Sequence, residues 1–233
     1  MLFRSRTDAG VHATGQAASF ECDAELEPRR LVAGVSALCR PDAAVVAADR
    51  APAGFNARFA SRGKRYRYRL LNRPAPSPLF AGVTWHVTGA LDRAAMQDAA
   101  ARLVGTHDFA GFRSADCGRE STERTITAVR LEPGLAPQSI DVVVEGTAFL
   151  KNMVRILVGT LVEVGHGKLP PDRVDRVLAS GDRTEAGVTA PAHGLTLERV
   201  FFEDDWPWSR SRVAQDHFLP PSGGETLKSV KPS

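Results

Sequence analysis

The chain has 233 residues, of which 43% are hydrophobic, and a formal net charge of +3. This length allows one large domain or two small ones, and the hydrophobic content suffices for a buried core, which excludes a chain that is disordered by composition. Because no apolar run reaches the length of a membrane span and the N-terminus lacks a signal-peptide pattern, we expect a cytoplasmic protein without a membrane partner.

The first third of the chain predicts two short strands and a helix. Residues 13–20 predict a strand, and Pro28 begins a helical segment. A short strand is expected over 45–48, and the Pro/Gly-containing residues 51–54 are the best linker. The helix has one apolar stripe, formed by Leu31, Val35 and Leu38.

The rest of the chain predicts more strands and helices without regular βαβ alternation. Residues 65–71 alternate as a strand does, and residues 126–131 and 140–148 predict two antiparallel strands. Asp92 can cap a helix that reaches Val104. Three further elements are expected: a helix over 150–161, a short helix over 171–179 and a strand over 195–202. This order predicts an α+β fold.

The basic residues cluster between residues 58 and 73, where no acidic residue interrupts them. A polyanionic partner such as RNA would explain the cluster, and so would the solvated edge of a sheet, so charge alone leaves both interpretations open. The cysteines give no metal signal, because they are odd in number, far apart and outside any Cys-x-x-Cys pattern. We therefore expect reduced thiols and no bound metal.

Asp8 is the most informative residue, because it stands between Arg6 and a glycine turn at Gly10 in a stretch with almost no other charge. Arg6 and Asp8 share a face of an extended chain, and Gly10 permits a bend that a side chain disfavours. A lone Arg-Thr-Asp is a weak signal, since Asp is commonly a turn or cap residue.

The whole string Arg-Thr-Asp-Ala-Gly-Val-His-Ala over residues 6–13 resembles the signature of the tRNA pseudouridine synthase A family. Further stretches resemble family motifs in the family's order, and together they cover roughly residues 4–204. These are Thr-Gly-Gln at 14–16, Phe-Asn-Ala-Arg-Phe at 55–59, Lys-Arg-Tyr-Arg-Tyr at 64–68, Gly-Thr-His-Asp-Phe at 105–109 and Phe-Leu-Lys-Asn-Met-Val-Arg at 149–155.

The resemblance implies a pseudouridine synthase fold, with two ferredoxin-like α/β halves and an antiparallel sheet around a basic cleft. The truncated first half would span residues 1–56, the second half 57–206, and a flexible tail 207–233. The implied activity is isomerisation of uridine to pseudouridine in the anticodon stem-loop of tRNA, at uridines 38–40, by a homodimer. Because this isomerisation changes no oxidation state, no cofactor is expected.

The resemblance also implies site roles. Asp8 matches the catalytic residue, and Arg6 would follow the departing base or hold its phosphate. Tyr66 matches the tyrosine that contacts the flipped uracil, although strand alternation alone predicts a core residue. Arg155 matches the basic residue that pairs with the catalytic carboxylate, although it lies off the apolar stripe of its helix, as a solvated arginine does. His107 and Asp108 form a tempting acid–base pair, but we expect Asp108 to be a cap or turn residue.

One departure concerns the start of the chain. Family members begin with a further strand, loop and helix before the motif, whereas this chain has only residues 1–5 there. A misassigned start, a gene fragment and a shortened variant would each explain the difference. The alternative function is therefore a shortened, catalytically weak paralogue that acts as an RNA-binding module.

Overall fold

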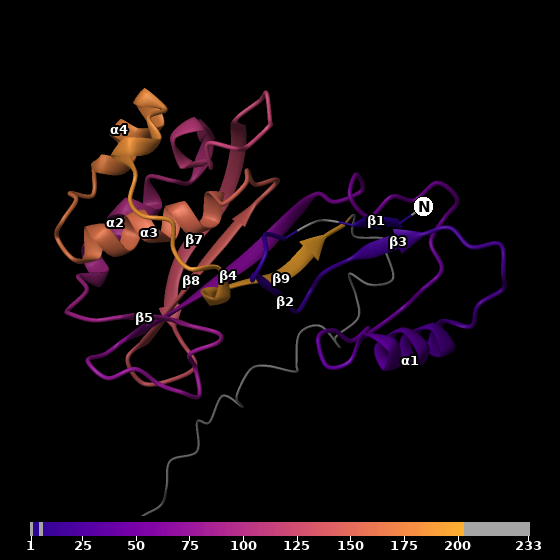
Figure 1. The fold of residues 1–233 in the computed structure, drawn as a ribbon. Helices are drawn as coiled ribbons and strands as arrows, with labels where there is room; N and C mark the ends of the chain where they lie inside the picture. The colour runs from indigo at the N-terminus through magenta and orange to yellow at the C-terminus, as the bar shows by residue number, and fades with distance from the viewer. Residues whose placement is uncertain (1, 5–6, 203–233) are drawn as a thin grey trace, which may run out of the picture.

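The structure, a computed structural model, describes residues 2–4 and 7–202 (Figure 1). Arg6 and the tail expected over residues 207–233 lie outside the described residues. The helices are α1 (Pro28–Cys39), α2 (Arg93–Ala101), α3 (Met153–Gly165) and α4 (Arg173–Ser180), with short 3-10 helices at Ala110–Phe112, Arg183–Glu185 and Ala192–Gly194. The strands are β1 (Leu2–Arg4), β2 (His12–Ala13), β3 (Ala18–Phe20), β4 (Gly63–Asn72), β5 (Trp85–Val87), β6 (Gly105–Asp108), β7 (Glu123–Pro133), β8 (Ser139–Gly146) and β9 (Leu195–Phe201).

One mixed sheet organises the described chain, in the order β2-β9-β4-β8-β7-β6, with β5 paired to the end of β4. The pairs around β4, β7, β8 and β9 are antiparallel, whereas β2 joins β9 and β5 joins β4 in parallel. A separate antiparallel pair joins β1 to β3. Helices α2, α3 and α4 gather on one side of the sheet, while α1 lies away from them, on the side of β1 and β3 (Figure 1). This mixture of helices and a largely antiparallel sheet confirms the α+β class.

The core lies between the sheet and the helices α2 and α3. Side chains alternate between the two faces of β4, so every second residue of this strand points into the core. Tyr66, Tyr68 and Leu70 point to the helices and are buried, with exposed fractions of 8%, 0% and 0%. Helix α3 is apolar almost all round, and nearly all of its residues are buried. None of the helices in residues 2–4 and 7–202 is long and apolar enough to cross a membrane.

The opposite face of the sheet is charged, because the arginines of β4 alternate with its core residues. The Arg67 guanidinium binds three carboxylates, those of Glu132, Asp141 and Glu198, at 3.0, 3.0 and 2.9 Å. These acids come from β7, β8 and β9, so Arg67 ties the middle of the sheet together across four strands.

Most expected elements are confirmed, and the differences have local causes. Residues 13–20 form two short strands rather than one, because β2 pairs with β9 whereas β3 pairs with β1. The strand expected over 45–48 is wrong: the backbone N–H of Val45 donates to Ser36 Oγ at 2.8 Å instead of to a neighbouring strand. Helix α1 forms as expected, but Leu38 on its apolar stripe is 88% exposed. Asp92 caps α2 through Ala94 and Ala95, and α2 ends at Ala101 rather than at Val104.

Candidate active site

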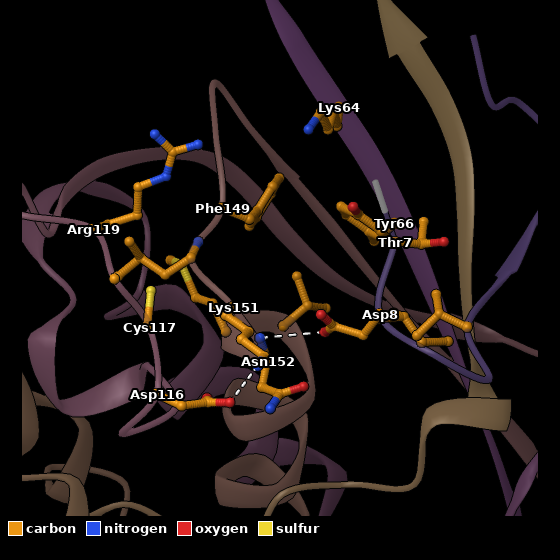
Figure 2. Close-up of a pocket in the computed structure, with 16 residues that line it drawn as sticks. Thr7, Asp8, Lys64, Tyr66, Asp116, Cys117, Arg119, Phe149, Lys151 and Asn152 are labelled. Carbon is orange, nitrogen blue, oxygen red and sulfur yellow. Dashed lines mark hydrogen bonds and ion pairs between the residues drawn. The ribbon is translucent and has the colours of Figure 1, made fainter. Parts of the chain in front are cut away.

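A pocket of about 430 Å³ opens where the motif loop meets the N-terminus of α3 and the start of β4 (Figure 2). We call it the Asp8 pocket. Its wall combines the motif loop, β4, the 116–119 loop and the turn that leads into α3. The lining residues are Thr7, Asp8, Val11, Lys64, Tyr66, Asp116, Cys117, Gly118, Arg119, Phe149, Leu150, Lys151, Asn152, Met153, Val154 and Leu195.

The motif loop holds Asp8 at the pocket because a turn and a strand follow it at once. The Val11 N–H donates to the Asp8 carbonyl oxygen at 3.1 Å, and Gly10 in the turn has φ +77°, a conformation that side chains disfavour. His12 and Ala13 then pair with β9, which fixes the loop to the central sheet. The bend expected at Gly10 is therefore confirmed.

The Asp8 carboxylate faces the N-terminus of α3. The backbone N–H of Asn152, the residue that precedes the helix, donates to Asp8 Oδ2 at 3.3 Å (Figure 2). Asn152 has φ 60°, in the left-handed region, where asparagine is tolerated better than most residues. The N-terminus of a helix presents backbone N–H donors that no residue of the helix binds, and here the donor that reaches the Asp8 side chain comes from the residue just before α3.

Tyr66 reaches the same pocket from β4. Its ring meets the Phe149 ring edge to face, with centroids 5.2 Å apart. Burial, and secondarily the negative charge of Asp8, raise the pKa of the Tyr66 phenol to about 12. The phenol therefore keeps its proton at neutral pH. The side chain is almost fully buried, as strand alternation predicts, and it also lines the pocket.

Arg155 lies in the first turn of α3 and is linked to Asp8 through Asn152. Its Nη1 donates to Asn152 Oδ1 at 2.8 Å, and its Nε donates to the Ala190 carbonyl oxygen at 2.7 Å. Among the described residues there is no ion pair between Arg155 and Asp8, so the expected direct pairing is not formed here. The reason is geometric, because the Arg155 guanidinium already binds the Asn152 side chain and the Ala190 carbonyl oxygen.

Comparison with known proteins decides the family. A sequence profile of the tRNA pseudouridine synthase family matches residues 99–203. The tRNA pseudouridine synthase A of Myxococcus xanthus is 50% identical over 202 residues, which are 87% of this chain and 76% of that protein. The protein of the same name from Geobacter sulfurreducens is 48% identical over 197 residues, covering 84% and 80% of the two chains. The chain belongs to the tRNA pseudouridine synthase A family.

Family motifs found in the sequence meet in the Asp8 pocket, although they are far apart in the chain. The 6–13 string supplies Asp8, the 64–68 string supplies Lys64 and Tyr66, and the 149–155 string supplies Phe149 and Asn152. Phe149 and Asn152 were not expected as site residues, although both lie inside a family motif. Lys64 was expected only as one member of the basic 58–73 cluster.

The 113–122 loop forms a further part of the pocket wall. Its Ser114 N–H donates to the Lys151 carbonyl oxygen at 3.2 Å, and the Asp116 carboxylate binds the Lys151 ammonium. The loop is thereby fastened to the turn that carries Asn152, and it brings Cys117 and Arg119 to the pocket wall.

The histidines near the motifs contact backbone carbonyls. His12 Nε2 lies 2.9 Å from the Gly82 carbonyl oxygen, and His107 Nε2 lies 3.2 Å from that of Val104. Asp108 Oδ1 accepts from the Ala110 N–H at 2.9 Å, a contact typical of an Asp at a turn, which agrees with the expectation of a cap or turn residue. Within residues 2–4 and 7–202, no group of three or more His, Cys, Asp or Glu side chains is arranged to hold a metal ion.

Proposed function

We propose that this chain isomerises uridine to pseudouridine in tRNA, with Asp8 as the catalytic residue. The observation that carries the proposal is the meeting of Asp8 and Tyr66 in one pocket, with the Asp8 carboxylate on the Asn152 N–H at the start of α3. Both relatives compared above are tRNA pseudouridine synthase A proteins, which supports the same substrate and reaction.

The reaction breaks the bond from ribose C1′ to uracil N1 and forms a bond from C1′ to C5. The proton on C5 leaves and N1 gains one, so no electrons enter or leave. The Asp8 carboxylate is suited to act as a nucleophile or to stabilise positive charge on the sugar. Tyr66 and Phe149 offer ring faces and edges to a base that has been flipped out of an RNA stem.

Arg155 and Arg6 complete the proposed site. Arg155 acts through Asn152, because it holds the residue whose backbone binds Asp8. Arg6 is proposed, from its place in the motif, to follow the departing base or to hold its phosphate. We further propose uridines 38–40 of the anticodon stem-loop as targets and a cytoplasmic homodimer as the working form. The proposed architecture is two ferredoxin-like halves, residues 1–56 and 57–206. These details rest on the family resemblance.

The test is pseudouridine formation on unmodified tRNA, measured by tritium release from C5-labelled uridine and followed by mapping of the modified positions. We expect Asp8→Asn to abolish turnover while tRNA affinity stays within several-fold, because asparagine keeps the shape but loses the negative charge. Activity of Asp8→Asn within tenfold of the unaltered chain would contradict the catalytic assignment. An unaltered chain that binds tRNA without turnover would instead favour the RNA-binding module.

A further inference from the structure

The basic stretch of residues 58–73 divides into two groups in the structure. Most of its β4 arginines are occupied by partners within the fold. Arg65 Nε binds Glu145 at 3.0 Å, Arg67 binds three carboxylates, and Arg69 Nη1 donates to Thr196 Oγ1 at 3.0 Å. Arg73 donates to the backbone carbonyls of its own turn. These cations serve the sheet, so they are poorly placed to bind an RNA strand.

Lys64 behaves differently from the arginines that follow it on β4. It is partly buried, it lines the Asp8 pocket, and in the described part of the chain its ammonium has neither a carboxylate nor a hydrogen-bond acceptor as partner. The two described acids of the pocket are engaged elsewhere, Asp8 by the Asn152 N–H and Asp116 by the Lys151 ammonium. Burial, followed by the positive charges of Arg58 and Arg119, lowers the pKa of Lys64.

Arg58 and Arg119 therefore lie close enough to Lys64 for their charges to act on it, although they come from separate loops. Neither guanidinium forms an ion pair within residues 2–4 and 7–202. Figure 2 shows Lys64 and Arg119 on either side of Phe149, at the opposite end of the pocket from Asp8 and Asn152. The Asp8 pocket thus has a carboxylate at one end, and at the other end two cations, Lys64 and Arg119, that form no ion pair among the described residues.

A half-buried cation beside two further cations is unfavourable until an anion joins them. We propose that Lys64, together with Arg58 and Arg119, binds one backbone phosphate of the RNA strand that carries the flipped uridine. This inference rests on the proposed function, because it assumes that the uracil lies between Asp8, Tyr66 and Phe149. If the uracil lies beside Asp8, the ribose and its two flanking phosphates lie farther toward the mouth of the pocket. There the Lys64 ammonium can bind a phosphate as a single positive charge.

The first test compares Lys64→Gln with Lys168→Gln, which makes the same change on an exposed lysine after α3, away from the pocket. We expect Lys64→Gln to weaken tRNA binding about tenfold, as loss of a charged hydrogen bond does. The slope of log affinity against log salt should fall by about 0.7–0.9, because one phosphate contact is lost. Lys64→Arg should retain most of the affinity, and Lys168→Gln should match the unaltered chain. Equal affinity and slope for Lys64→Gln and Lys168→Gln would overturn the proposal.

The second test locates the phosphate. Two anticodon stem-loop RNAs carry a neutral methylphosphonate, one on the 5′ side and one on the 3′ side of the target uridine. For one of them, Lys64→Gln should cause no further loss of affinity, because the charge that Lys64 binds is already absent. If Lys64→Gln lowers the affinity by the same factor for both methylphosphonate RNAs as for the unmodified RNA, Lys64 contacts neither flanking phosphate and the proposal is wrong. Arg119→Gln, on an exposed loop residue, serves as the second variant if Lys64→Gln does not fold.

Binding is measured separately from turnover, so the two proposals can fail separately. A chain that forms no pseudouridine contradicts the proposed function even if Lys64→Gln changes affinity. A chain that forms pseudouridine at full rate and affinity after Lys64→Gln contradicts only the phosphate contact.

Discussion

Asn152 links the parts of the site at the scale of single residues. Its backbone N–H binds Asp8, which is 144 positions away in the sequence, and its side chain accepts from Arg155. Both contacts depend on the left-handed backbone at this position, which costs a non-glycine residue about 1–2 kcal/mol. Strain of this kind persists where surrounding contacts hold it, and it is common at functional sites.

Arg155→Ala should lower both activity and stability, because it removes the charged donor that fixes the Asn152 side chain and the Ala190 carbonyl. Hydrogen bonds from charged groups contribute about 1.5–3 kcal/mol each, so we expect a loss of that order in the free energy of unfolding. Denaturant unfolding and tritium release measure the two effects. Arg176→Ala, on the exposed face of α4, is the control and should change little. Unchanged melting and rate in Arg155→Ala would show that Arg155 has no part in the site.

Tyr66 predicts a pH dependence of stability in alkaline solution. An unfolded tyrosine loses its proton near pH 10, whereas folded Tyr66 keeps it up to a pKa of about 12. Between these values the unfolded chain binds fewer protons, so the free energy of unfolding falls as pH rises. The expected loss across the window is roughly 2–3 kcal/mol from this residue. Tyr66→Phe should make the fall between pH 10 and 12 shallower by the part that Tyr66 contributes, while the part due to buried Tyr68 remains.

Phenolate absorbance gives an independent measurement, because the chain has only two tyrosines and burial raises the pKa of Tyr68 as well. The folded protein should show little phenolate at a pH where the urea-unfolded chain is half ionised. Coincident titration curves for the folded and unfolded states would contradict a buried Tyr66.

At the scale of elements, the site depends on a close contact between α3 and the 186–190 segment. The Gly187 N–H donates to Thr160 Oγ1 at 2.9 Å, and the Ala190 N–H donates to the Arg155 carbonyl oxygen at 3.1 Å. Gly159 permits this approach, because a Cβ there would lie 1.7 Å from the Val188 carbonyl oxygen. The same contact brings Ala190 to the Arg155 guanidinium, so helix packing and site geometry are coupled.

Gly159→Ala should therefore destabilise the fold by about 2–3 kcal/mol, as overpacking of a core contact does, and should reduce activity by displacing Arg155. Gly34→Ala is the matched control, because no atom lies within 4 Å of a Cβ built there and the residue is inside α1. Alanine has the higher helix propensity, so this control should be neutral or slightly stabilising. The melting temperatures of the two variants and of the unaltered chain test this prediction. Equal melting temperatures for Gly159→Ala and Gly34→Ala would count against the close contact.

At the scale of the whole molecule, charge is divided between the polar face of the sheet and the Asp8 pocket. A net charge of +3 understates this division, because two of the β4 arginines, Arg65 and Arg67, are neutralised locally by Glu132, Asp141, Glu145 and Glu198. Binding to RNA should weaken as salt increases, since phosphate contacts release counterions. The slope should reflect the pocket cations rather than every basic residue of the 58–73 stretch.

Arg67→Met tests whether this arginine stabilises the sheet or binds RNA. It leaves three carboxylates without their cation, and we expect a loss of about 2–3 kcal/mol in the free energy of unfolding, less than for a fully buried pair because the site is partly exposed. The slope of log tRNA affinity against log salt should stay unchanged. Urea unfolding and binding over a salt series provide the data. A reduced slope in Arg67→Met would place Arg67 on the RNA, and salt-independent binding by the unaltered chain would remove the electrostatic argument altogether.

The elements with strong periodicity and the residues of the family motifs were predictable from the sequence. The alternation of β4 and the apolar pattern of α3 depend on neighbours in the chain, so both elements and their buried faces were predictable. Asp8 and Tyr66 were found because whole motifs, and not single residues, matched a family.

Tertiary structure decided which of these residues have partners. The 45–48 segment had strand composition but found no strand to pair with, and an isolated segment gains no ladder hydrogen bonds. Asn152 became the partner of Asp8, and Arg155 the partner of Asn152, through contacts that no local pattern encodes. The cations of 58–73 looked equivalent in sequence, yet the acids of β7, β8 and β9 bind Arg65 and Arg67, whereas Lys64 lines the pocket. The physical reason is the same in each case: a charge or a backbone group acquires its role from the partner that folding brings to it.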